Sequence, residues 1–193
     1  MKPPSRPLSN AVFVALLASM LATRFHHFGT ALNLPDASMA VFFLGGLYLR
    51  RHGLFVVFIA LAVAIDWISI ELAGVSNFCV TPAYAFVLPA FATLWYGGRA
   101  CADRLQSNAA SVAFVFAIAI ACSAVSFAIS NGAFYWLGGR YAEPNLGEYL
   151  ARLWTWGPLF VRTTSCYVGV ALLVQLALSR RGGVHDAAAS ADR

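Results

Sequence analysis

The sequence predicts an all-α, polytopic membrane protein, a compact bundle of six transmembrane helices. Two observations lead to this prediction. Hydrophobic residues make up 60% of the 193-residue chain and charged residues only 11%, whereas a soluble domain usually carries about 25% charge. In addition, six apolar segments follow one another along the chain, at residues 10–22, 38–49, 53–72, 78–96, 109–137 and 153–178.

The six segments differ in length. About 20 apolar residues are needed for a helix to cross the hydrocarbon core. Segment 38–49, which contains Gly45 and Gly46, is too short unless it starts inside the preceding loop. Segment 109–137 is longer than required, so we expect it to tilt or to project beyond the membrane. We expect residues 1–181 to form a single membrane domain, and the small and polar residues 182–193 to form a disordered cytoplasmic tail.

The basic residues predict how the bundle is oriented. If the N-terminus lies inside, nine lysines and arginines lie on the inner side and four on the outer side. Such an excess is typical of cytoplasmic loops, so we expect both ends of the chain inside. The inner set is Lys2, Arg6, Arg50, Arg51, Arg99, Arg104, Arg180, Arg181 and Arg193, and the outer set is Arg24, Arg140, Arg152 and Arg162. No basic run is interleaved with aromatic residues, so no nucleic-acid partner is expected.

This orientation places many of the uncommon polar side chains in the outer half of the bundle. They come from several segments, so we expect side chains of different helices to lie at the same level of the bundle. Such an arrangement predicts a pocket that opens to the outside. The residues are His26, His27, Asp36, Asp66, Glu71, Asn77, Cys79, Tyr84, Tyr141 and Arg152.

Asp66 is the strongest single signal, because it lies well inside the apolar run IALAVAIDWISIELAG. An ionised carboxylate in a membrane is costly, and such residues usually face a cavity or a partner. Two interpretations remain open. Asp66 forms a structural ion pair with Arg152 or Arg24, or it contacts a ligand directly, and the two roles can coexist.

Cys79 lies in the stretch GVSNFCVTPAYAF. Pro82 fits the first turn of the fourth helix, which would place Cys79 at the mouth of that helix. A thiol near a helix N-terminus tends toward the thiolate and can bind a soft or borderline metal. A lone membrane cysteine more often serves packing, and this is how we interpret Cys101, Cys122 and Cys166. The scattered spacing of the four cysteines predicts neither a disulfide framework nor a structural zinc site.

These residues resemble those of a known family, the BtuM-type vitamin B12 (cobalamin) S-components of the energy-coupling-factor transporters. The resemblance extends over nearly the whole chain in length, helix number and orientation. The matching stretches are RFHHFG at 24–29, AIDW at 64–67, SNFCVTPAYAF at 76–86 and EYLARLW at 148–154. Carried over position by position, the ligand-binding set of the family falls on His27, Asp66, Cys79, Tyr84 and Arg152.

The resemblance implies a transport and binding protein rather than an enzyme, located in the bacterial inner membrane. It implies that the Cys79 sulfur binds the cobalt of cobalamin in the base-off form. Asp66, Tyr84 and Arg152 would then meet the amides of the corrin rim, and His27 would orient a ligand or relay a proton. A thiolate on cobalt could also expel cyanide from cyanocobalamin. An energy-coupling module, a scaffold protein with two ATPases, is the partner that the family normally uses.

Two other functions compete with this one. The chain could be an S-component for a different vitamin, in which case no metal-binding thiol is needed. It could instead be a thiol-dependent membrane enzyme in which Cys79, His27 and Asp66 act as nucleophile, base and orienting group. The chain contains no GxxxxGK[ST] sequence, so we expect no nucleotide site of that type in the chain itself.

Overall fold

The fold is known from a computed structural model, which describes the backbone of residues 6–24 and 34–191. It describes the side chains of the same residues apart from Ala73, Cys79 and 180–191. Six α-helices and two short 3-10 helices make up this part of the chain, which contains no strand. They are α1 (Arg6–Thr23), α2 (Ser38–Tyr48), α3 (His52–Ala73), η1 (Asn77–Cys79), η2 (Pro82–Phe86), α4 (Val87–Cys101), α5 (Ala109–Leu137) and α6 (Leu146–Ala191).

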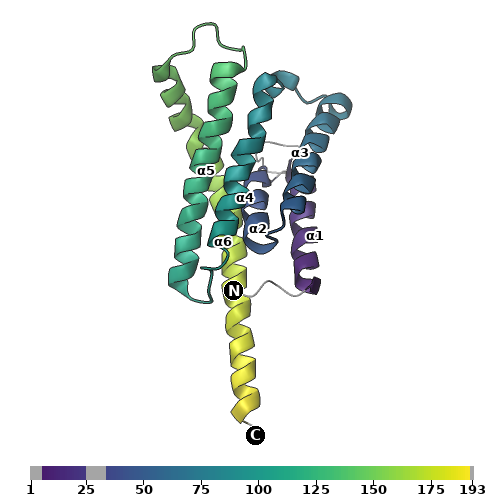
Figure 1. Cartoon of the computed structure of the whole chain (residues 1–193), viewed down its shortest axis with the longest axis vertical. Coiled ribbons are helices and arrows are strands. Elements are labelled where there is room, and N and C mark those ends of the chain that lie inside the picture. Colours follow the sequence, from purple (N-terminus) through teal and green to yellow (C-terminus); the bar gives the residue numbers. More distant parts are fainter. Residues whose placement is uncertain (1–5, 25–33, 192–193) are drawn as a thin grey trace.

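The predicted all-α class is confirmed, and a helix lies at each of the six apolar segments (Figure 1). Four of the helices are long and apolar enough to cross a membrane, namely α1, α3, α5 and α6. Helices α2 and α4 are shorter. Six membrane crossings, and the sidedness of the two termini, therefore stay predictions.

Helix α2 lies in the middle of the bundle. Its 11 residues extend over about 16 Å, well short of the roughly 30 Å hydrocarbon core. Nine of the 11 residues are buried, so the helix is hydrophobic all round, as expected for a helix enclosed by others. Phe42 stacks on Phe91 of α4, with 4.1 Å between ring centroids. Gly45 and Gly46 lie directly against Trp95, and a methyl group on either would overlap that residue.

The fourth segment differs from its prediction. We expected one helix over 78–96, but η1 and η2 come first and α4 starts only at Val87. Pro82 explains the break, because a proline disfavours helical geometry in the residue before it. Thr81 is accordingly extended, with φ −139° and ψ 172°. Pro82 therefore opens η2, which leads into α4, and does not lie in the first turn of α4 itself.

Helix α6 begins earlier than predicted, at Leu146, and continues through Pro158. Its C-terminal part projects beyond the other helices (Figure 1). The backbone is helical through Ala191, which includes most of the range 182–193 for which the sequence predicts disorder. That disorder stays a prediction.

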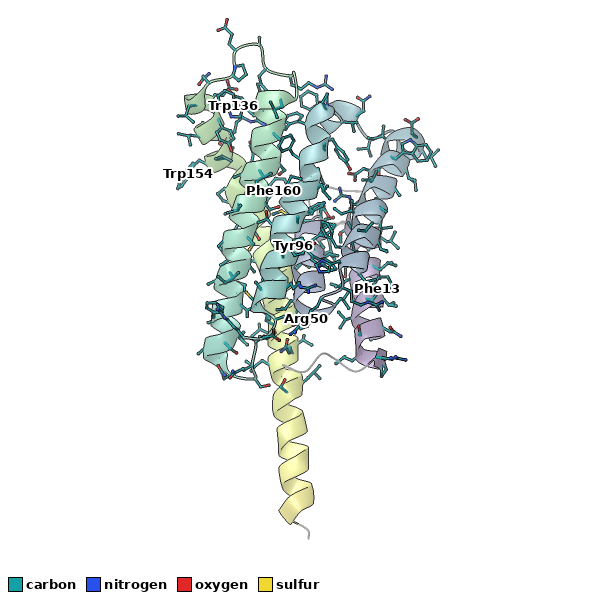
Figure 2. All side chains as sticks on the ribbon, in the orientation of Figure 1. Phe13, Arg50, Tyr96, Trp136, Trp154 and Phe160 are labelled. Atoms are coloured by element: carbon teal, nitrogen blue, oxygen red, sulfur yellow. The ribbon has the colours of Figure 1, made fainter. Side chains whose placement is uncertain are left out.

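The bundle has two ends that differ in character. At the lower end of Figure 1 lie the α2–α3 turn (residues 49–51) and the α4–α5 loop (residues 102–108), where α1 also begins. At the upper end lie the α3–α4 connection (residues 74–86) and the α5–α6 loop (residues 138–145). Figure 2 labels Arg50 at the lower end and Trp136 at the upper end.

Candidate functional site

A buried ion pair joins α1 to α3. Arg24 follows the last residue of α1, and its side chain is only 5% exposed. Its Nε donates to Asp66 Oδ1 at 2.8 Å and its Nη2 donates to Asp66 Oδ2 at 2.7 Å. This two-point geometry is the strongest form of an arginine–carboxylate contact. Of the two partners that the sequence left open for Asp66, the structure shows Arg24.

Further polar groups surround this pair. The hydroxyl of Tyr84, in η2, donates to Asp66 Oδ2 at 2.6 Å. Arg24 Nη1 donates to Ser38 Oγ at 2.8 Å and lies 3.6 Å from Asp36 Oδ2. Ser38 Oγ in turn donates to Asp36 Oδ1. We call Arg24, Asp36, Ser38, Asp66 and Tyr84 the Arg24 cluster.

The Arg24 cluster connects four parts of the fold: the end of α1, the start of α2, the middle of α3 and η2. Asp66 accepts three hydrogen bonds within it. Each nitrogen of the Arg24 guanidinium also donates to an acceptor, the third being the contact with Ser38. The two aspartates against one arginine give the cluster a formal charge of −1. The cluster holds these elements together, because hydrogen bonds that are largely shielded from solvent are stronger than the same bonds in water.

Two of the five predicted ligand-binding residues, Asp66 and Tyr84, therefore meet directly. Arg152 lies elsewhere, near the start of α6. Its guanidinium carbon is 5.0 Å from the ring centroid of Tyr141 and 5.8 Å from that of Tyr135. These are cation–π distances. The suggested pairing of Arg152 with Asp66 is not seen.

The other two predicted residues cannot be placed in the same way. His27 lies outside the described residues, as does His26. Cys79 is the last residue of η1, and two residues separate it from Pro82, the first residue of η2. Its side chain lies outside the description. The cobalt-binding role of Cys79 and the role of His27 stay predictions.

At the upper end, Tyr135, Tyr141 and Tyr149 pack together, and this aromatic cluster was not predicted from the sequence. Tyr135 stacks on Tyr149 at 5.8 Å between ring centroids and lies 4.6 Å from Tyr141. Its hydroxyl donates to Glu148 at 2.9 Å. The Tyr135–Tyr149 contact joins α5 to α6. Glu148 is the signal in the sequence that could have indicated this contact, because a buried tyrosine hydroxyl usually forms a hydrogen bond with a polar partner.

The three cysteines with described side chains differ in burial, and only Cys101 is fully enclosed, as the predicted packing role requires. Cys101 is buried, Cys122 is half-buried and Cys166 is exposed, and all three are free thiols. Among the described side chains, no group of three or more His, Cys, Asp and Glu residues is arranged to hold a metal ion. No family model matches the chain, and no curated protein matches it.

Proposed function

We propose that this chain is a membrane-embedded carrier that binds cobalamin on its outer side and takes part in its uptake across the bacterial inner membrane. The observation that supports this most is the buried Arg24 cluster. Ionisable residues inside apolar helices are costly and usually mark a substrate path or a binding site. Here they fix η2, and with it the connection that carries Cys79, to α1 and α3. The resemblance of the stretch around Cys79 supplies the ligand.

In this proposal the Cys79 thiolate is the axial ligand of cobalt, and the benzimidazole base of the vitamin is displaced. Thiolate is a strong donor to transition metals of this kind. His27, Tyr84 and Arg152 are the further contacts that the resemblance suggests. Asp66 acts mainly by holding Arg24 and Tyr84, since its oxygens already accept three hydrogen bonds.

The test uses the full-length protein in detergent, mixed with cobalamin and then separated from free vitamin. We expect the wild type to co-elute with cobalamin and to show an absorption spectrum shifted from that of the free vitamin. The Cys79→Ser variant should lose the shifted spectrum. Cys166→Ser is the matched control, because Cys166 is an exposed free thiol on α6, and this variant should behave as the wild type. Absence of co-elution, or a Cys79→Ser spectrum equal to that of the wild type, would contradict the proposal.

Ligand exchange at cobalt gives a second readout. With cyanocobalamin, the Cys79 thiolate would form a Co–S bond as the Co–C bond to cyanide breaks. Cyanide leaves with its electron pair, and the oxidation state of cobalt is unchanged. We expect the wild type to release cyanide and Cys79→Ala to release none. An unaltered cyano spectrum in both proteins would exclude this reaction.

The energy source is tested separately. An energy-coupling module with two ATPases is the partner that the resemblance suggests. Growth on limiting cobalamin, in hosts with and without such a module, shows whether the chain depends on it. If growth requires the module, the chain acts as its substrate-binding component.

A further inference from the structure

Three buried polar atoms near the upper end have no hydrogen-bond partner within the described part of the chain. They are Thr81 Oγ1 in the α3–α4 connection, Asn131 Oδ1 near the end of α5, and Arg152 Nε near the start of α6. A buried polar atom without a partner destabilises the fold, because it has lost its hydrogen bonds to water and gained none in return. Native proteins contain few of them, so three in one region of a small bundle call for an explanation.

The three residues belong to elements that meet at one stretch of α5. Asn131 lies one helical turn before Tyr135, so the two share a face of α5, and the guanidinium carbon of Arg152 is 5.8 Å from the Tyr135 ring. Phe78, from the same connection as Thr81, packs against Phe134 with 5.5 Å between ring centroids. Helix α5 also contacts η2, of which Thr81 is the N-cap.

Ordinary helix packing does not explain the missing partners. Serine and threonine hydroxyls in these helices usually donate to a carbonyl of their own helix. Ser130, the neighbour of Asn131, donates to the carbonyl of Phe127 at 3.2 Å, and Thr155 on α6 donates to that of Ala151 at 2.8 Å. Thr81 lies in extended backbone before η2, where no such helix carbonyl is at hand. The buried atoms of Thr81, Asn131 and Arg152 all have no hydrogen-bond partner among the described residues.

We propose that Thr81, Asn131 and Arg152 together bind a carboxamide group of the transported ligand. A carboxamide offers a carbonyl acceptor and an NH₂ donor. The Arg152 Nε–H matches the carbonyl, Asn131 Oδ1 matches the NH₂, and the Thr81 hydroxyl can serve either group. The inference rests on the proposed function, because the corrin rim carries such amides. It adds Thr81 and Asn131 to the ligand-binding residues, neither of which the sequence had singled out.

The test is a cobalamin titration of the full-length protein in detergent, comparing Asn131→Leu and Thr81→Val with the wild type. We expect each substitution to raise Kd by about tenfold or more, as for the loss of a buried hydrogen bond. The spectrum at saturation should stay that of the wild type, because the cobalt ligand is untouched. Ser130→Ala and Thr155→Val are the matched controls and should change Kd by less than about twofold, since their hydroxyls already have partners.

A second measurement separates ligand binding from a role in folding. In the absence of cobalamin, both variants should unfold at the same temperature as the wild type or higher, because an apolar group replaces an unpaired polar atom. A clear loss of thermal stability without ligand would show that these side chains serve the fold, and would overturn the inference. If the wild type binds cobalamin and both variants bind it equally well, the inference alone fails. If the wild type binds none, the proposed function fails and this site fails with it.

Discussion

Two arginine–aspartate pairs in this protein have the same closest distance and different surroundings. Arg24 Nη2 lies 2.7 Å from Asp66 Oδ2, with side chains 5% and 15% exposed. Arg50 Nη1, at the lower end, lies 2.7 Å from Asp103 Oδ1, with side chains 23% and 80% exposed. The first pair is shielded and shares its carboxylate with Tyr84, whereas water surrounds the carboxylate of the second. Burial and further partners, and not distance, decide how much each pair contributes.

The largest effect is expected for Asp66→Leu, which leaves the Arg24 guanidinium buried without its main partner. We expect a loss of about 3–5 kcal/mol in the free energy of unfolding, as for other broken buried pairs. Thermal unfolding in detergent measures it. The double variant Arg24→Met with Asp66→Leu should lose much less than the sum of the two single variants, because it removes both charges. Additive losses would show that the pair is not coupled.

A smaller effect is expected for Tyr84→Phe. This change removes one hydrogen bond to a charged acceptor, Asp66 Oδ2, and we expect a loss of about 1.5–3 kcal/mol in unfolding free energy. Tyr96→Phe is the matched control at the lower end, where the exposed Tyr96 hydroxyl lies 3.1 Å from His52 Nδ1. The same thermal assay should show little change for it. Equal losses in both variants would remove the distinction between the two regions.

Arg50→Gly tests whether the exposed pair matters at all. Arg50 has φ +58°, a left-handed conformation that costs a non-glycine residue about 1–2 kcal/mol. Its amide donates to the carbonyl of Gly45 after the end of α2, a place where glycine is usually found. We expect the glycine variant to be as stable as the wild type or more stable by up to about 1 kcal/mol, since relief of strain exceeds the loss of the surface pair. A clear loss of stability would show that the Arg50 side chain has a larger role.

The smallest effect is expected for Asp103→Asn. The hydrogen bond from Arg50 and the charge of that residue hold the pKa of Asp103 below its usual value. A carboxylate whose pKa is lower in the folded protein stabilises the fold above the unfolded pKa, and this contribution is lost as the pH falls through the folded pKa. The difference between wild type and variant should therefore begin to shrink below about pH 4, near the unfolded pKa, and disappear once the pH is below the folded pKa. It should also shrink at high salt because the site is exposed, and a difference that persists in both conditions would contradict this.

Much of the helical layout could be predicted, because it depends on local hydrophobicity. The partner of Asp66 could not be chosen, since Arg24 is 42 positions away and periodicity does not choose between it and Arg152. The start of α6 was placed too late because Glu148 and Arg152 interrupt the apolar pattern, although their side chains lie against the aromatic residues of the upper end. The break before α4 was missed for a different reason. Pro82 was assigned to a first helical turn, while its effect on the preceding Thr81 was not considered.

The enclosed position of α2 has a consequence for how the protein is made. At 11 residues, this helix is too short to span a bilayer by itself. Trp95, which covers its two adjacent glycines, is synthesised some fifty residues later. The glycine face of α2 is therefore covered only after α4 has been made, so the final packing of this helix depends on a segment that follows it by a long stretch of chain.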